Sequence, residues 1–231
     1  MKPRTKFRLL RLGALWFVVA TGAAMLAYPG GTRLDPSTRG YSFGHNSLSD
    51  LGATVAGNGA SNWPSAVLFV AALVPAGASL IAFFVTLFPL HREPGSRAWL
   101  SGAGCAAGVV AGLGYIGVAA APSNHWHGLH ALAANVAFRA FLVSSVLMGI
   151  ATAGNPAFSR RAAAAWFSFA VLLLGFVLLG SFGPSRGTAT GLWIHAVAQK
   201  AIVLATLGIV AYQSYEAQSV AESGANAERG G

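Results

Sequence analysis

The chain is short of charged residues. Only 9% of its 231 residues are Asp, Glu, Lys or Arg, whereas a soluble domain usually carries about 25%. It has six acidic residues and a single cysteine, Cys105, and a lone cysteine excludes an intrachain disulfide. These shortages exclude an ordinary water-soluble domain and a disulfide-stapled fold.

Apolar residues take the place of the missing charge. Hydrophobic side chains make up 55% of the chain, which also has 29 glycines and a mean hydropathy of +0.59. A helix needs roughly 20 apolar residues to cross a hydrocarbon core ~30 Å thick. Six runs meet that length, at about residues 9–28, 65–90, 98–121, 130–153, 162–182 and 191–212.

These runs predict an all-α, polytopic membrane protein. One six-transmembrane-helix domain is expected over residues 1–216. Residues 217–231 are polar and end in glycine, which is typical of a disordered tail. In the third run, small residues recur every four positions, and this spacing lets two helices approach closely. They are Gly104, Gly108 and Gly112, and they predict that the third helix packs at the centre of the bundle.

Lysine and arginine are distributed unequally between the two sets of connections. Ten lie in the N-terminus, the second and fourth connections and the tail: Lys2, Arg4, Lys6, Arg8, Arg11, Arg92, Arg97, Arg160, Arg161 and Arg229. Three lie in the other connections: Arg33, Arg39 and Arg186. The positive-inside rule therefore predicts both termini in the cytoplasm and residues 40–54 outside, in a cell inner membrane. A nucleic-acid partner is not indicated, because the net charge of +9 forms no basic patch with interleaved aromatic residues.

Residues 40–54, here called the polar segment, separate the first two runs. Five polar residues fall within six positions there: His45, Asn46, Ser47, Ser49 and Asp50. One interpretation is a solvated loop in which Ser47, Ser49 or Asp50 caps a short helix. The other is the edge of a site, for which the segment must fold back between the helices. Glycines are expected to supply the turns: Gly44, Gly52 and Gly57.

Histidines gather on the predicted outer face. Five of the six are there: His45, His125, His127, His130 and His195. Neutral imidazole and carboxylate oxygen are ordinary zinc ligands, so zinc is a candidate cofactor, with His125 and His127 as candidate ligands. The spacing matches no strong metal motif, however, and the alternative is that these side chains lie at headgroup level and bind water.

Two cations lie inside predicted spans. Arg139 and Lys200 are each nine residues into a run, or roughly 13 Å deep. A charge at the membrane centre costs about 2.5–3.5 kcal/mol on insertion scales, and such residues are usually functional. Asp50 is the expected protein anion for these cations, so it is predicted to lie near Arg139 or Lys200. One carboxylate for two cations leaves room for a phosphate or carboxylate ligand.

Residues 41–52 read Tyr-Ser-Phe-Gly-His-Asn-Ser-Leu-Ser-Asp-Leu-Gly and stand between the first run and five more. This arrangement resembles the domain-of-unknown-function 998 family of prokaryotic multi-pass membrane proteins, with Pro122 and the histidine-bearing loop as further support. The Frag1/DRAM/Sfk1-like six-helix family is a rival, since its corresponding loop has a similar Ser-Asp-x-Gly pattern. The resemblance implies a six-helix frame in a membrane and brings no established activity.

Two functional hypotheses follow. The first is a pocket that binds a lipid headgroup or another anionic small molecule through His45, Asn46, Ser47, Ser49, Arg139, Gln199 and Lys200. The second is an intramembrane hydrolase, with or without a metal, in which Asp50, His130 and His195 are catalytic and activate water. Convergence of Asp50 and the histidines on one point would favour the enzyme.

Overall fold

The computed structural model describes residues 3–91 and 98–230, and these residues form helices and no strand. Six of the helices are long and apolar enough to span a membrane. They are α1 (Pro3–Ala27), α3 (Trp63–Leu87), α4 (Ala98–Ala120), α5 (His127–Ala153), α6 (Arg160–Phe182) and α7 (Ala189–Gly230). The predicted all-α, six-span architecture is confirmed, and the chain is a multi-pass membrane protein.

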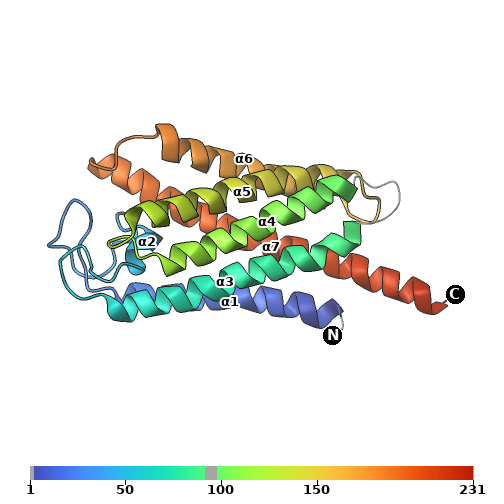
Figure 1. The fold of residues 1–231 in the computed structure, drawn as a ribbon, viewed down its shortest axis with the longest axis horizontal. Helices are drawn as coiled ribbons and strands as arrows, with labels where there is room; N and C mark the ends of the chain where they lie inside the picture. Colours follow the sequence, from blue (N-terminus) through green and yellow to red (C-terminus); the bar gives the residue numbers. More distant parts are fainter. Residues whose placement is uncertain (1–2, 92–97, 231) are drawn as a thin grey trace.

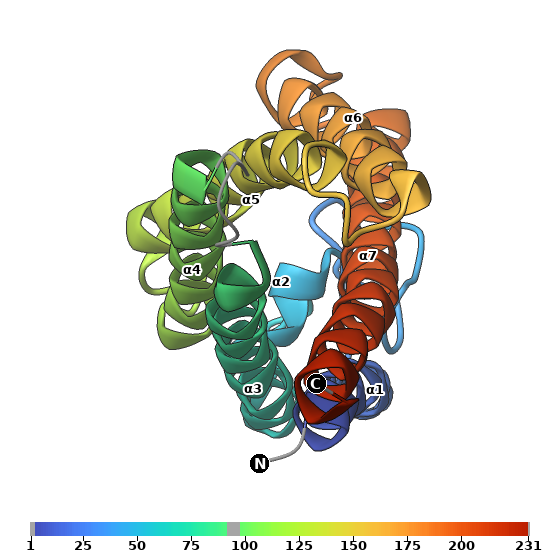
Figure 2. The ribbon, with the colours of Figure 1, turned by 90° about the vertical axis from the view of Figure 1, so that its right-hand side faces the viewer.

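The spanning helices form a ring when the bundle is viewed along its length (Figure 2). Each helix packs against two neighbours in the order α1, α3, α4, α5, α6, α7 and back to α1. Aromatic side chains from several helices meet inside the ring. Phe84 of α3, for example, lies 6.0 Å from the Phe141 ring of α5 and 6.2 Å from the Trp166 ring of α6, measured between ring centroids.

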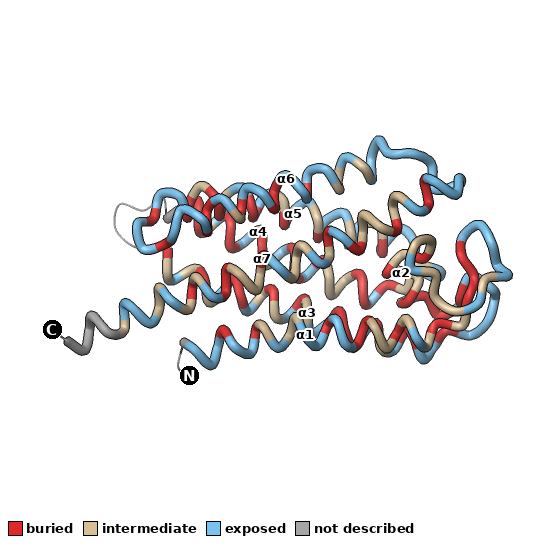
Figure 3. The backbone as a smooth tube through the Cα atoms, turned by 180° about the vertical axis from the view of Figure 1, so that it is seen from behind, coloured by how far each residue is buried: buried red, intermediate tan, exposed pale blue. Residues whose placement is uncertain are grey.

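The two ends of the bundle differ in what they carry. Both termini lie at one end, which is called the terminal end here (Figure 1). The opposite end, the loop end, carries the connections 28–62, 121–126 and 183–188. The first of these contains a short helix, α2 (Leu48–Leu51), and α3 is followed at the terminal end by a 3-10 turn, η1 (Phe88–His91). Figure 3 shows that the part of α6 near the loop end is exposed over most of its surface.

Glycines set the contacts of α4 with its neighbours, as predicted from their spacing, but α4 is one member of the ring and does not lie at the centre of the bundle. A Cβ atom added to Gly108 would lie 2.2 Å from the Phe84 ring, and one on Gly104 would lie 2.9 Å from the Met148 sulfur. At Gly112 the added atom would lie 2.8 Å from the main-chain oxygen of Gly77 in α3. The absence of side chains therefore lets α4 approach both α3 and α5 closely.

The end of the chain differs from the expected disordered tail. Residues 217–230 continue α7 as helix, and Ala217 is fully buried in the core. The reason is packing that continues beyond the last apolar residues. Gln213 donates to the Ala162 carbonyl of α6, and Arg11 of α1 donates to Gln218 while its guanidinium covers the Tyr215 ring. These contacts hold α7 against α1 and α6.

Candidate functional site

The polar segment folds back into the loop end of the bundle. Its helix α2 lies within the outline of the ring (Figure 2), and Leu51 is fully buried in a cluster with Phe17 and Phe69. The turns along this path do not occur at Gly44, Gly52 and Gly57, where they were expected. Positive φ angles occur at Gly30, Gly31, Gly40 and Gly59. Gly44 and Gly52 instead allow close approach, since added Cβ atoms would lie 3.0 Å from Trp193 and 2.6 Å from Phe69.

Asp50 holds the start of α2 in place. Its carboxylate accepts hydrogen bonds from the Ser47 main-chain N–H (2.9 Å), the Ser47 hydroxyl (2.8 Å) and the Asn46 side-chain amide (3.1 Å). The bond from the Ser47 N–H is the reciprocal bond of a capping box, with Ser47 as the N-cap residue. The capping interpretation of the sequence therefore describes what Asp50 does locally.

Asn46 is the hub of the segment. Its side chain is almost fully buried, donates to the Gly31 carbonyl as well as to Asp50, and accepts from the Ser42 N–H. Its main-chain carbonyl accepts from the Tyr41 hydroxyl at 3.0 Å. Burial, with a further contribution from the nearby Asp50 charge, raises the pKa of Tyr41, which keeps this hydroxyl protonated as a donor.

Lys200 reaches the same carbonyl from α7. It is 4% exposed, and its ammonium donates to the main-chain oxygens of Asn46 (2.5 Å) and Ala196 (3.1 Å). The Tyr41 and Phe43 rings lie 5.3 and 5.0 Å from the ammonium nitrogen, in reach of cation–π attraction. Of its three N–H donors, two have partners among the described residues and one is left for a ligand.

The neighbouring residue of α7 also binds the segment. The Gln199 side-chain oxygen accepts from the Leu48 N–H at 2.8 Å, and its amide nitrogen lies 3.5 Å from the Ser49 hydroxyl. The Leu48 N–H is at the first turn of α2, where no intrahelical acceptor exists. Gln199 and Lys200 together therefore fasten the polar segment to α7.

Around the Lys200 ammonium, positively charged side chains outnumber negatively charged ones. The Asp50 carboxylate acts electrostatically on both Lys200 and Arg186, and Arg186 lies within electrostatic range of Arg33. Within the described part of the chain, the Asp50 side chain bonds only to Ser47 and Asn46, so no ion pair neutralises these cations. Three cations and one carboxylate leave a net charge of +2. We call Lys200, Arg186, Arg33 and Asp50 the cationic mouth.

Arg139 does not belong to this group. It lies on the exposed surface of α5, as does Asn135 one turn away. The buried face of α5 is the opposite one, with Ala137, Phe141 and Ser144 at 0% exposure. The prediction that Asp50 lies near Arg139 or Lys200 is therefore met through Lys200 alone. The sequence shows that Asn135 and Arg139 share one face of α5 but does not show whether that face turns into the bundle or away from it.

The five histidines of this end are used separately. His125 lies 2.8 Å from the Thr54 hydroxyl and, with Asn124, fastens the connection before α5 to the polar segment. His130 bonds to the Ala121 carbonyl at the end of α4, at 2.8 Å. His195 bonds to the Pro184 carbonyl at 3.0 Å, and His45 lies 3.3 Å from the Ser42 hydroxyl.

The fifth histidine, His127, is exposed and has no hydrogen-bond partner among the described residues. No three His, Cys, Asp or Glu side chains of the described ranges stand close enough together to hold a metal ion. The convergence of Asp50, His130 and His195 that the hydrolase hypothesis needs is therefore missing, and His125 is bonded to Thr54 whereas His127 is exposed.

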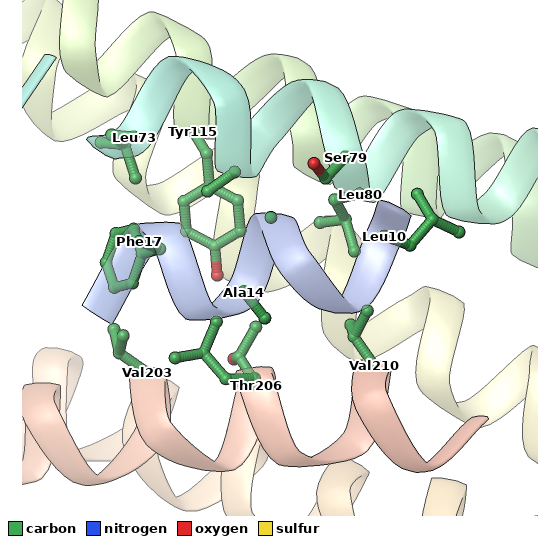
Figure 4. A pocket seen from close by; sticks show the side chains of 13 residues that line it. Leu10, Ala14, Phe17, Leu73, Ser79, Leu80, Tyr115, Val203, Thr206 and Val210 are labelled. Atoms are coloured by element: carbon green, nitrogen blue, oxygen red, sulfur yellow. The ribbon is translucent and has the colours of Figure 1, made fainter. Parts of the chain in front are cut away.

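A cavity of about 70 Å³ begins one helical turn deeper than Lys200 and extends along α7 from Val203 to Val210, between α1, α3, α4 and α7 (Figure 4). Phe17, Leu73 and Val203 belong to its apolar wall. The Tyr115 hydroxyl points into it toward the side chain of Thr206, whose hydroxyl also lines the space. Since one water molecule needs ~10–15 Å³, the cavity has room for a larger apolar group.

Sequence reasoning missed two residues that build the site. The Asn62 amide, which is fully buried, donates to the carbonyls of Asp50, Leu51 and Ala53 and so holds the end of α2. Tyr41 supplies a ring beside Lys200 and a hydroxyl to Asn46. An asparagine directly before the second apolar run was the available signal for Asn62, since it looks like a helix cap.

Comparison with known proteins adds no family. No family model matches the chain, and no curated protein or solved structure is significantly similar to it. Membership of the domain-of-unknown-function 998 family, or of the rival Frag1/DRAM/Sfk1-like family, therefore stays a prediction.

Proposed function

We propose that the protein binds an anionic group, the phosphate of a membrane lipid headgroup, at the cationic mouth. The observation that carries this proposal is the unbalanced charge there. Lys200 is buried with one N–H donor unassigned, and Arg186 and Arg33 lie nearby without a bonded carboxylate among the described residues. Buried cations are stable when an anion neutralises them, and a phosphate is a strong acceptor for both Lys and Arg.

A lipid is favoured over a soluble anion by the surroundings of the mouth. Aromatic side chains are exposed at the loop end, among them Phe43, Trp63, Trp126 and Trp193. Such residues are typical of the membrane–water interface, where headgroups lie. The apolar cavity one turn below Lys200 offers space for part of an acyl chain.

The same proposal places the polar segment outside the cell, in an inner membrane with both termini in the cytoplasm. The asymmetry of ten cations against three supports this orientation. The partners are then lipids of the outer leaflet or another anionic small molecule from that side. The alternative of a metal-dependent hydrolase has no supporting geometry, because the histidines bind separate partners.

Short-chain lipids test the proposal. Purified protein in a nonionic detergent is titrated with dihexanoyl phosphatidylglycerol, dihexanoyl phosphatidylcholine and inorganic phosphate, and binding is followed by tryptophan fluorescence. Trp193 is a suitable reporter because its indole lies beside Gly44 of the polar segment. The anionic lipid is expected to bind more tightly than the zwitterionic one, and its binding is expected to weaken with added salt.

Two arginine variants separate binding from folding. Arg186 is exposed, so Arg186→Gln is expected to keep the fold and to weaken phosphatidylglycerol binding about tenfold, as the loss of a charge-assisted hydrogen bond does. Arg39→Gln removes an exposed cation of the same end outside the mouth and serves as the control. Equal affinities for Arg186→Gln and wild type would refute the site, and tight binding of phosphate alone would make the ligand a soluble anion.

A further inference from the structure

Arg139 is a charged residue at the middle of a span. It stands 12 residues after the start of α5 at His127 and 14 before its end at Ala153. At 1.5 Å per residue, these separations are about 18 and 21 Å. Its side chain is exposed and has no hydrogen bond or ion pair with any residue that the structure describes.

The face that carries Arg139 turns away from the rest of the bundle. On one side of α5, Ala137 meets Gly114 of α4, and Ser144 donates to the Gly104 carbonyl. On another side, Gly149 meets Phe167 of α6. Arg139 lies opposite the α4 contact and about 80° around the helix from Gly149 at 100° per residue, on the same exposed face as Asn135, Leu132, Val136 and Val143. In a membrane this face meets lipid or another protein.

Among the side chains that the structure describes, no carboxylate pairs with Arg139. The acidic residues of the chain are Asp35, Asp50, Glu93, Glu216, Glu222 and Glu228. In sequence, the first three lie in or next to the connections between spans, and the last three come 27 or more residues after the start of α7. A second copy that used the same face would place one arginine against another, which is repulsive.

We propose that the face of α5 bearing Asn135 and Arg139 docks a transmembrane helix of another membrane protein that carries an Asp or Glu at mid-membrane depth. A carboxylate would neutralise the guanidinium in a bidentate pair. Asn135 lies one turn nearer the loop end, and its amide donates to the Ala131 carbonyl, so its side-chain oxygen is open to a donor of the partner. The apolar neighbours on this face supply van der Waals packing, which drives helix association in lipid.

A lipid phosphate is the main competitor for Arg139. Side chains of a helix point toward its N-terminus, so the guanidinium of Arg139 extends toward the loop end. An extended arginine reaches roughly 6–7 Å, which leaves the charge on the order of 10 Å below the first residue of α5. A lipid phosphate would have to move down into the bilayer to reach this charge. A carboxylate carried on a partner helix at the depth of the guanidinium can pair with it directly.

Designed peptides test the proposal in proteoliposomes of phosphatidylcholine. The probe is a Leu/Ala helix of about 23 residues with one central Asp, and the matched control peptide has Asn instead. Energy transfer from donor-labelled protein to acceptor-labelled peptide reports association. The Asp peptide is expected to bind wild type at least about tenfold more tightly than the Asn peptide, and Arg139→Leu is expected to remove that preference.

Control variants keep the result interpretable. Val143→Leu changes the same face without changing its charge and is expected to behave as wild type, and Arg139→Lys is expected to retain the preference in part. Equal binding of the Asp and Asn peptides to wild type would overturn the proposal. So would Arg139-dependent energy transfer between two labelled copies, or Arg139-dependent enrichment of phosphatidylglycerol around the protein, because these results would assign the face to a second copy or to lipid phosphate.

Discussion

The ammonium of Lys200 donates a hydrogen bond to the main-chain carbonyl of Asn46, although the two residues stand 154 positions apart in the chain. This bond joins the first connection at the loop end to the last spanning helix. The Asp50 carboxylate bonds to the side chain of the same Asn46, so Asn46 separates the two charges while it holds both. The cation therefore keeps a free donor instead of being consumed in an ion pair.

Replacement of Asp50 tests how the polar segment is held. The Asp50 carboxylate accepts three hydrogen bonds, from the Asn46 amide and from the N–H and hydroxyl of Ser47. Asp50→Asn leaves a single acceptor oxygen for these donors and places an amide N–H₂ group, itself a donor, against some of them. The expected destabilisation is about 1–3 kcal/mol, the cost of leaving buried donors unpaired. Thermal unfolding in detergent measures it. Asp35→Asn is the control and should have little effect, since Asp35 is exposed and its carboxylate bonds only to Ser37 among the described residues; equal small effects would contradict the role of Asp50.

Gln199 is predicted to protect one amide in particular. Gln199→Leu removes the acceptor of the Leu48 N–H, so hydrogen exchange of that amide should accelerate about 5–10-fold, as expected for one net hydrogen bond. The control is Gln213→Leu, which breaks a bond to Ala162 from a position 14 residues further along α7. Unchanged exchange at Leu48 in Gln199→Leu would show that α2 is held without α7.

Gly108 should tolerate no large side chain. Gly108→Leu forces the new atoms against the Phe84 ring, so the melting temperature should fall, with a loss of about 1–3 kcal/mol or more. Gly175→Leu is the matched control, because a Cβ atom there meets nothing within 4 Å. A Gly108→Leu protein as stable as the control would place this face of α4 against lipid.

Metal removal should leave the protein unchanged. The histidines of the loop end bind Thr54, Ala121, Pro184 and Ser42 separately. Addition of EDTA, or of zinc, is therefore expected to shift neither the melting temperature nor phosphatidylglycerol binding. Stoichiometric zinc in the purified protein, with a lower melting temperature after chelation, would revive the metal-dependent hydrolase.

Reporter fusions test the orientation. A reporter inserted at Asn58, in the first connection at the loop end, should be active outside the cytoplasm. One fused to the C-terminus should be active inside it, because the cations concentrate at the terminal end. Signals from the same compartment would contradict the proposed orientation.

The six spans could be read from hydropathy because lipid demands a long apolar run for each crossing. The electrostatic interaction of Asp50 with Lys200, which passes through their shared partner Asn46, was also expected from sequence, since a buried cation needs compensation. The face of Arg139 did not follow. A polar face on a spanning helix can turn toward the bundle or away from it, so the sequence alone does not choose; the inner side of α5 is set by Gly114, Gly104 and Phe167 of its neighbours. The helical tail was missed for a similar reason, because Arg11, which bonds to Gln218 of the tail, is distant in sequence.

The length of α7 gives the loop end a mechanical connection to the opposite side of the membrane. The helix runs from Ala189 to Gly230, and Lys200 lies 30 residues before its last residue, or about 45 Å at 1.5 Å per residue. If Lys200 acts as the pivot, a tilt of about 5° displaces the far tip by ~4 Å over that length. Binding of an anion at the cationic mouth would then change the position of the C-terminal end of α7 at the opposite end of the bundle.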